Sequence, residues 1–335
     1  MRAKRVAVIT AMLATACWIA TGGLEPASAE LAITAKDASA QPDPLPATVI
    51  HAEQSPGPGA SSMTQADDPV DTLAAAGGPP GSGRLWRNSL GMEFVPIPGT
   101  NLLFCKWETR VQDYAAFVRR TGRKWPKPKI EQDPMHPAVN VTWDDANAFC
   151  EWLTEREQKV GLLPDEGRDS LTYRFGERGN EVGFMPTGCR YRLPADLEWS
   201  VAVGGLGVET GKTPYARNGK IIGVYPWDGP FPPPAGAGNY APVRETDTYQ
   251  YTAPVGSFAT NRYGLCDMSG NVSEWCLDGW LQESFTPGPG DRTLRGGSWF
   301  HSTPWHLVSS AREKAASNFD DIRIGFRVVL ELPAR

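Results

Sequence analysis

Large aromatic side chains are confined to one part of this 335-residue chain. Eleven of the twelve tryptophans lie between Trp86 and Trp305, whereas residues 30–84 contain no phenylalanine, tyrosine or tryptophan. The segment 30–84 is rich in Ala, Pro, Gly, Ser and Asp, so it cannot bury enough apolar surface to offset the entropy of ordering. We therefore predict a flexible tether at 30–84 and one folded domain at 85–335, which is long enough for a substantial core.

The first 29 residues have the pattern of a secretory signal peptide. A basic start precedes an apolar run from Val6 to about Ala20, and the small residues 27–29 offer a cleavage site. An N-terminal membrane anchor is the alternative, and Cys17 is a poor site for lipidation. No later segment is long and apolar enough to span a membrane. We expect an exported protein, periplasmic or extracellular, with no spanning segment in the mature chain.

Charge and cysteine content exclude two kinds of site. The net charge of −5 gives no basic surface for nucleic acid. No CxxC occurs and zinc-type spacing is absent, so a structural zinc site is not expected. Five cysteines remain after signal removal, and their pairing is open: Cys105, Cys150, Cys189, Cys266 and Cys276. We favour buried, inert thiols for most of them.

Short strands and a few helices are expected within 85–335. The strands fall in 92–97 and 102–110, which form a hairpin, and later in 253–258, 293–299 and 322–330. A capping box at Thr109–Gln112 predicts a helix that ends near Gly122, and Thr142 caps a second helix that ends at Gly161. A third helix is expected before Gly205. The absence of repeats and of βαβ alternation favours an α+β domain, loop-rich and with little regular secondary structure.

Eight segments resemble, in order, the formylglycine-generating enzyme family, also called sulfatase-modifying factor. They are GMEFVPIPG, WETRVQDYAAFV, HPAVNVTWDDANAFCEWL, YRLPADLEW, YPWD, APVGSFATNRYGLCDMSGNVSEWC, LRGGSW and IGFRVVL. The resemblance implies a variant of the C-type lectin fold. The family includes copper-dependent oxidases that convert a sulfatase cysteine to formylglycine, and the same fold also serves as a ligand-binding scaffold. Fold resemblance therefore leaves the function open.

The resemblance also implies two structural calcium sites. The first matches four residues: Asp267, Gly270, Val272 and Glu274. The second matches four residues ahead of APVGSF: Asn239, Tyr240, Asp247 and Tyr249. Calcium takes several oxygen ligands. The Asp, Glu and Asn side chains would supply carboxylate or amide oxygens, and the other residues their backbone carbonyls.

The sequence departs from the family at the copper site. Catalytic members carry two cysteines, five residues apart, whose thiolates bind Cu(I). The matching positions hold His301 and His306, so standard formylglycine-generating activity is not expected. Imidazole suits Cu, Zn, Fe or Ni, and a different metal site is one interpretation. Two histidines are fewer than the three or four ligands usually needed, and Pro304 favours an irregular loop. Polar loop residues and ligand contact without a metal stay open.

The candidate groove contains five residues: Ser298, Trp299, His301, Trp305 and His306. Ser298 as a nucleophile would need a positioned base, and no Asp-oriented triad can be identified. We expect RGGSW to be a strand whose glycines allow close backbone approach. Arg312, Arg323 and Arg327 are either buried ion-pair partners or groove residues.

Two functions follow from these observations. The first is an exported oxidoreductase that acts on a peptide or small molecule with a noncanonical metal site. The alternative is a non-catalytic, calcium-stabilised lectin-like module that binds a ligand or partner protein through the Phe300–His306 loop. The absent cysteine pair favours binding, whereas family coverage favours catalysis, so whether the protein is an enzyme stays open.

Overall fold

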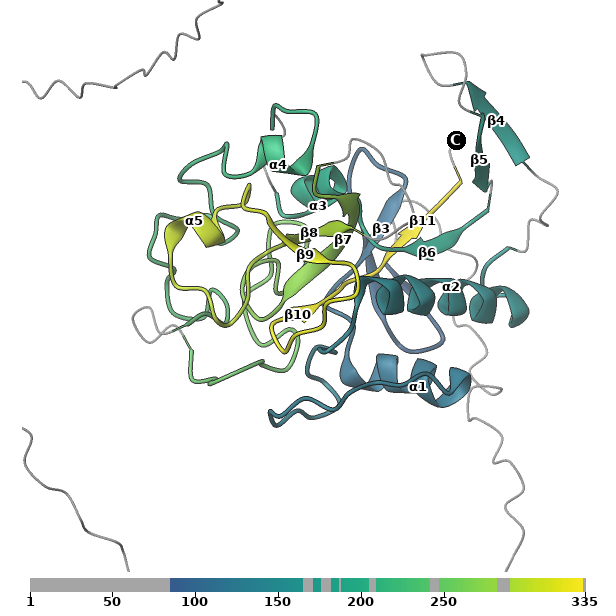
Figure 1. Cartoon of the computed structure of the whole chain (residues 1–335), viewed down its shortest axis with the longest axis horizontal. Helices are drawn as coiled ribbons and strands as arrows, with labels where there is room; N and C mark the ends of the chain where they lie inside the picture. Colours follow the sequence, from purple (N-terminus) through teal and green to yellow (C-terminus); the bar gives the residue numbers. More distant parts are fainter. Residues whose placement is uncertain are drawn as a thin grey trace, which may run out of the picture. The chain divides into compact units, whose positions relative to one another are not determined.

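The computed structural model describes residues 85–164, 171–175, 182–186, 188–204, 209–241, 247–281 and 290–333. The predicted signal peptide and tether lie outside the described residues. Helices and short strands alternate with long loops in this part of the chain, which confirms the α+β class (Figure 1). Among these residues no helix combines the length and the apolar character needed to cross a membrane.

A five-stranded antiparallel sheet joins segments from both ends of the described chain. Its order is β1 (Trp86–Arg87), β2 (Glu93–Pro96), β3 (Leu102–Cys105), β11 (Val329–Glu331) and β6 (Arg190–Arg192). β2 and β3 form the predicted hairpin, in which Val95 lies opposite Phe104. β3 is buried along its whole length, because β11 pairs with it and separates it from β6.

A four-stranded sheet carries the candidate site. Its order is β10 (Ile324–Gly325), β7 (Ser273–Gly279), β8 (Asp291–Arg295) and β9 (Glu313–Ala316). β10 runs parallel to β7, and the other pairs are antiparallel. Glu313 at the start of β9 lies opposite Leu294, just before β8 ends. A separate hairpin consists of β4 (Leu171–Phe175) and β5 (Val182–Pro186).

Five helices occur among the described residues: α1 (Val111–Thr121), α2 (Trp143–Lys159), α3 (Asp196–Ala202), α4 (Pro214–Arg217) and α5 (Pro304–Leu307). Thr142 caps α2 as predicted, because its hydroxyl accepts a hydrogen bond from Asp145 N at 3.1 Å. The predicted box at Thr109–Gln112 is wrong by one position. Arg110 is the residue before α1, and its backbone N donates to the Asp113 carboxylate at 3.1 Å.

The apolar faces of α1 and α2, which lie side by side in Figure 1, meet in an aromatic core. Phe149 of α2 lies 5.9 Å from Tyr114 and 5.7 Å from Phe117 of α1, measured between ring centroids. Phe326, which precedes β11, lies 5.5 Å from Phe149. Large aromatic side chains bury much apolar surface, so this core explains their confinement to the folded domain.

The three strands predicted in the C-terminal third differ from the structure. Residues 253–258 form a turn instead of a strand. The strand predicted at 293–299 ends at Arg295, because Gly296 and Gly297 have φ of 88° and 69°, a backbone conformation that strands do not adopt. The stretch 322–330 contains two short strands, β10 and the start of β11.

A buried ion cluster ties β8 to the segment that leads into β9. Asp196, at the start of α3, contacts three guanidinium groups. The nearest atoms are 2.9 Å away for Arg217, 2.6 Å for Arg295 and 2.7 Å for Arg312. Arg295 is the last residue of β8 and Arg312 directly precedes Glu313, so the cluster fixes the backbone on both sides of the candidate site.

The five cysteines of the described residues are buried. Burial raises the pKa of Cys105 to about 12 and that of Cys266 to about 11. Such thiols stay protonated at neutral pH and are poor nucleophiles and metal ligands. The predicted burial of the thiols is confirmed.

Candidate functional site

His301 and His306 face each other on the surface, with ring centroids 4.7 Å apart. The predicted irregular loop at Pro304 is wrong, because Pro304 is the first residue of the one-turn helix α5. Proline suits this position, since its φ is already helical and its missing N–H would have no partner there. The turn of α5 brings His306 back toward His301.

Gly297 allows this close approach. A Cβ at this position would lie 3.2 Å from the His306 carbonyl oxygen and 3.4 Å from His301 Nδ1. The backbone N of Ser298 donates to His301 Nδ1 at 2.9 Å, and the Ser298 hydroxyl lies 3.2 Å from the same nitrogen. The glycines of RGGSW thus provide the expected close backbone approach, although they form a turn. Ser298 is fully buried, which disfavours it as a nucleophile, as the sequence indicated.

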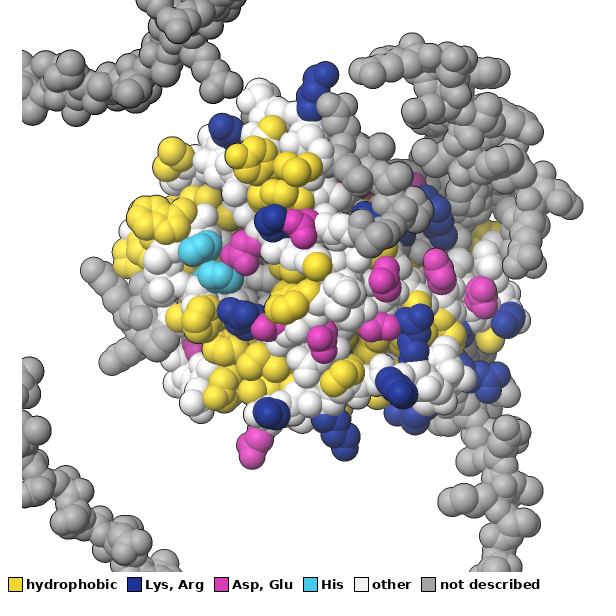
Figure 2. All heavy atoms as spheres, viewed as in Figure 1, with side chains coloured by type: hydrophobic (Ala, Val, Ile, Leu, Met, Phe, Trp, Pro, Cys, Tyr) yellow, Lys and Arg dark blue, Asp and Glu magenta, His cyan; other side chains and the backbone are white. Residues whose placement is uncertain are grey.

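Glu313 is the third member of the cluster. Its Oε1 lies 2.9 Å from His301 Nε2. One ligand atom from each of His301, His306 and Glu313 lies within 4.8 Å of the other two. The sequence did not indicate Glu313, because only the pairing of β9 with β8, which was not predicted, brings it beside the histidines. Figure 2 shows two histidine side chains side by side, with an acidic side chain next to them.

The electrostatics of the cluster favour a neutral imidazole beside an ionised carboxylate. Burial and the charge of His301 lower the pKa of His306, although Glu313 acts in the opposite direction. Burial acts to raise the pKa of Glu313, but His301, His306 and Arg323 together outweigh it and hold this pKa below its ordinary value. Neutral imidazole and carboxylate are the forms that bind metal ions.

Aromatic side chains border the cluster. Trp299 packs edge-on against Tyr251 and Phe300, with centroids 5.1 Å and 5.8 Å away. Phe300 is 55% exposed, and Trp305 of α5 is 69% exposed. Phe300 lies beside His301, with centroids 6.4 Å apart, and Ser298 is buried beneath them, whereas Trp305 is exposed on α5 next to His306 in sequence. Exposed aromatic side chains of this kind favour ligand contact.

The three arginines left open by the sequence have different roles. Arg312 is a buried partner of Asp196, and Arg327 is a buried partner of Glu274. Arg323 is partly exposed, pairs with Asp321 and lies 5.2 Å from the centroid of the Phe300 ring. Only Arg323 therefore belongs to the surface around the histidines.

The first predicted calcium site lies in a region of surplus buried negative charge. Glu274 is already engaged, because Arg327 and Trp199 donate to its carboxylate. Asp267 Oδ1 is buried and has no hydrogen-bond partner. Burial and nearby Glu274 raise the pKa of Asp267 to about 6, although Gly256 N and Arg327 oppose them. An orphaned carboxylate oxygen is what a bound cation would satisfy, so Asp267 fits the predicted site better than Glu274 does.

The second predicted calcium site has a similar orphaned atom. Asn239 is buried, and its Oδ1 has no hydrogen-bond partner. Asp247 accepts from the backbone N of Tyr240 at 3.1 Å and of Tyr249 at 2.8 Å. Asp247 thus contacts the backbone N–H groups of both tyrosines, whereas the prediction assigns their carbonyl oxygens as ligands. An amide oxygen and a carboxylate are suitable calcium ligands.

The two predicted calcium loops are packed against each other. Asn271 N donates to the Asn239 carbonyl oxygen at 2.8 Å, and Asn239 Nδ2 donates to Asn271 Oδ1 at 3.2 Å. Gly270 leaves no room for a side chain, because a Cβ there would lie 2.3 Å from the Asn239 carbonyl oxygen. The residues of both sites therefore belong to one tightly packed unit.

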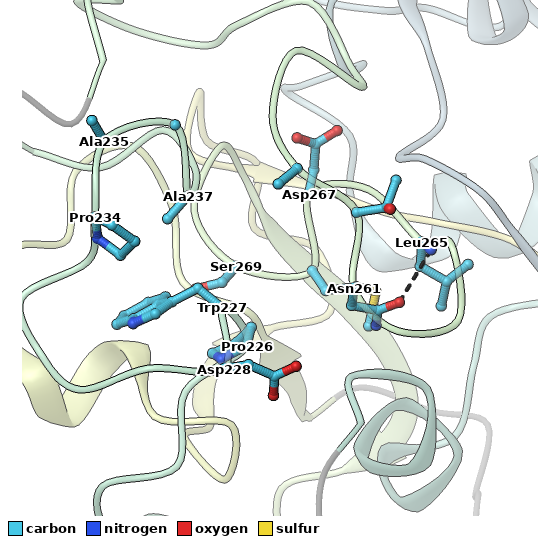
Figure 3. Close-up of a pocket in the computed structure, with 14 residues that line it drawn as sticks. Pro226, Trp227, Asp228, Pro234, Ala235, Ala237, Asn261, Leu265, Asp267 and Ser269 are labelled. Atoms are coloured by element: carbon cyan, nitrogen blue, oxygen red, sulfur yellow. Dashed lines mark hydrogen bonds between the residues drawn. The ribbon is translucent and has the colours of Figure 1, made fainter.

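A cavity of about 180 Å³ lies beside the first calcium loop (Figure 3). Its walls include Trp227 and Asp228 on one side and Asn261 and Leu265 on another. Ligand pockets usually enclose about 300–1,000 Å³, so this cavity is smaller than a typical ligand-binding pocket. None of the cluster residues lines it. The surface formed by His301, His306 and Glu313, called the histidine surface below, is the stronger candidate site.

Comparison with known proteins gives a consistent likeness. A family model described as a sulfatase-modifying factor enzyme 1-like domain matches residues 92–332. The chain is 28% identical over 193 residues to a formylglycine-generating enzyme of Thermomonospora curvata, covering 55% of this chain and 47% of that protein. It is 31% identical over 199 residues to the formylglycine-generating enzyme of Streptomyces coelicolor, covering 55% and 50%. The chain spans about half the length of these relatives.

Two further likenesses bear on fold and activity. An inactive C-alpha-formylglycine-generating enzyme 2 of Mus musculus is 29% identical over 188 residues, which cover 52% of this chain and 42% of that protein. The solved structure of PvdO from Pseudomonas aeruginosa has a TM-score of 0.52 at 21% identity and covers 76% of this chain and 100% of that one. At this identity the second likeness shows a shared fold alone.

Proposed function

The chain belongs to the sulfatase-modifying factor enzyme 1-like family, and we propose that it is an exported oxidoreductase acting on a peptide or small molecule at the histidine surface. One observation carries the proposal. His301 and His306, at the positions where the resemblance places copper-binding cysteines, lie face to face instead of diverging into solvent. Exposed Phe300 and Trp305 beside them offer contact area for a ligand. The pattern of residues 1–29 supports export.

The copper site of the catalytic relatives does not fit this chain. Cu(I) is a soft ion that prefers two thiolates, and imidazoles occupy both positions here. The five described cysteines are buried, so none is available as a surface thiolate. The proposed reaction therefore excludes a bis-thiolate copper centre, and the sulfatase motif is not the expected substrate.

Oxygen uptake by the purified chain without residues 1–29 tests the proposal. The substrates are a Cys-x-Pro-x-Arg peptide, unrelated cysteine peptides and small thiols, each with Fe²⁺ or Cu²⁺ added. We expect uptake and a product mass change with an unrelated peptide or a small thiol, lost in the double variant H301N/H306N. H136N is the matched control, because His136 contacts Thr252 and lies outside the cluster. Absence of uptake with every substrate, or unchanged uptake in the double variant, would contradict the proposal.

Calcium as a structural cofactor is part of the same proposal. The orphaned Asp267 Oδ1 and Asn239 Oδ1 support it, because each is a buried oxygen that lacks a donor. Gly270 and Val272 in the first site, and Tyr240 and Tyr249 in the second, would contribute backbone carbonyls. Bound calcium would offset the negative charge that Asp267, Glu274 and Glu108 share around the single guanidinium of Arg327.

A further inference from the structure

We propose that His301, His306 and Glu313 bind one divalent transition-metal ion through two imidazole nitrogens and one carboxylate oxygen. This inference goes beyond the proposed function, because the ion binds whether or not the protein turns over a substrate. It also replaces the copper ligation of the catalytic relatives with a different donor set.

The distances fit a single ion. Zinc binds imidazole nitrogen and carboxylate oxygen at about 2.0–2.2 Å, which places ligand atoms about 3–3.5 Å apart around the ion. His301 Nε2 and Glu313 Oε1 are 2.9 Å apart, and the three donor atoms lie within 4.8 Å of one another. His306 Nδ1 lies 2.7 Å from the Thr303 hydroxyl, so His306 would draw closer to the ion by a side-chain movement within this surface turn.

Glu313 Oε1 lies where an ion would be useful. It is a buried atom 2.9 Å from His301 Nε2. A buried carboxylate oxygen needs a donor or a cation, so an ion shared by these two atoms would stabilise the cluster.

The orientation of His301 assigns Nε2 as its metal ligand. Nδ1 faces Ser298, whereas Nε2 faces Glu313. Without a metal, Nδ1 accepts from Ser298 N, so a neutral ring carries its proton on Nε2. Metal binding displaces this proton to Nδ1, where the Ser298 hydroxyl at 3.2 Å is the acceptor. Because a protonated Nδ1 can no longer accept from Ser298 N at 2.9 Å, these two donors must move apart as the hydroxyl takes over. Ser298 is therefore a positioning residue.

The donor set identifies the class of ion. Two imidazoles and a carboxylate suit borderline divalent ions and are typical of non-haem Fe²⁺ and of catalytic Zn²⁺. Such sites keep coordination positions open for water or substrate. The exposed side chain of Phe300 lies 6.4 Å from the His301 ring, between ring centroids, so an ion bound here would be close to a ligand that contacts Phe300.

Calorimetric titration with Zn²⁺ alone tests the site. The chain without residues 1–29 is stripped with a chelator, refilled with Ca²⁺ and titrated. We expect one Zn²⁺ per chain, and binding at least about 100-fold weaker in H306N, E313Q and the double variant, because even second-shell changes cost about 10- to 100-fold. H136N and E155Q are matched controls that remove an imidazole and an exposed carboxylate elsewhere, and both should bind as the wild type does.

The outcomes separate this inference from the proposed function. Zn²⁺ binding that survives in H306N/E313Q, or that is lost in H136N, would overturn the site. Absence of binding to the wild type would do the same. Near-ultraviolet circular dichroism confirms that each variant is folded, and H306N alters only a surface side chain. Zn²⁺ binding without oxygen uptake would leave the metal site standing while contradicting the oxidoreductase.

Discussion

Arg295 donates to Asp196 through a 2.6 Å contact between Nη1 and Oδ1, and both side chains are fully buried. Arg312 contacts the same carboxylate oxygen at 2.7 Å. The two arginines lie just before the Gly296–Gly297 turn and just before Glu313. One buried carboxylate therefore holds together the two chain segments that carry the proposed metal ligands.

Replacement of Asp196 should destabilise the domain strongly. D196A leaves Arg295, Arg312 and Arg217 buried without their shared counter-charge, and the loss of one partner from a buried ion pair costs about 3–5 kcal/mol. Urea unfolding should therefore show a midpoint far below that of the wild type. E155Q, which removes an exposed carboxylate, should leave the midpoint unchanged. A loss below about 1 kcal/mol in D196A would mean that the cluster does not hold the site.

The stability of the domain should fall in strong acid because of the same carboxyl. Burial acts to raise the pKa of Asp196, but Arg295, Arg312 and Arg217 outweigh it and lower this pKa to about 2. A lowered carboxyl pKa contributes stability that is present above the unfolded value of about 3.9 and is lost as the pH falls toward 2. The free energy of unfolding at pH 2–4 should depend less steeply on pH in D196N than in the wild type. Equal slopes would contradict the assignment.

Calcium removal should lower the melting temperature. A ligand at 100 times its dissociation constant stabilises the folded state by about 2.7 kcal/mol, so Ca²⁺ should raise the melting temperature of chelator-treated protein. D267N should stabilise the calcium-free chain, because it removes a buried carboxylate next to Glu274, and should lose most of the Ca²⁺ response. Mg²⁺ should not substitute, since it demands smaller, more regular coordination. An unchanged Ca²⁺ response in D267N would exclude the first site.

Trp305 should affect ligand recognition and not stability. Its side chain is 69% exposed, so W305A should change the free energy of unfolding by less than about 0.5 kcal/mol. On a substrate found by oxygen uptake, W305A should raise KM with little change in kcat, because the loss is one of contact area. L281A, at another exposed apolar side chain, should leave KM unchanged. Identical kinetics in W305A and the wild type would place the ligand elsewhere.

Local signals in the sequence were sufficient for some elements. Thr142 with its acidic first turn predicted the start of α2 correctly, since the cap needs only residues within one turn. The Thr109 capping box was wrong because Asp113, one position beyond Gln112, reaches the backbone of Arg110 instead. A choice between two adjacent caps depends on tertiary contacts of the loop, which a spacing pattern does not contain.

The sequence predicted two of the three residues of the candidate site, His301 and His306. Its position followed from the family motif and the two histidines, but Pro304 indicated a loop where the structure has the helical turn of α5. Glu313 could not be identified, because its approach depends on the pairing of β8 with β9 and on the buried contacts of Asp196. The paired residues Leu294 and Glu313 are 19 positions apart, and Asp196 lies 99 positions from Arg295 and 116 from Arg312, so all of these contacts are beyond the range of local periodicity.

Crystals of the chain without residues 1–29, grown with Zn²⁺ and measured at the zinc absorption edge, test the proposed metal site. We expect one anomalous peak about 2.0–2.2 Å from His301 Nε2, from a ring nitrogen of His306 and from a carboxylate oxygen of Glu313. A map with no peak at these residues, or with its peak on other side chains, would contradict a divalent metal site at His301, His306 and Glu313.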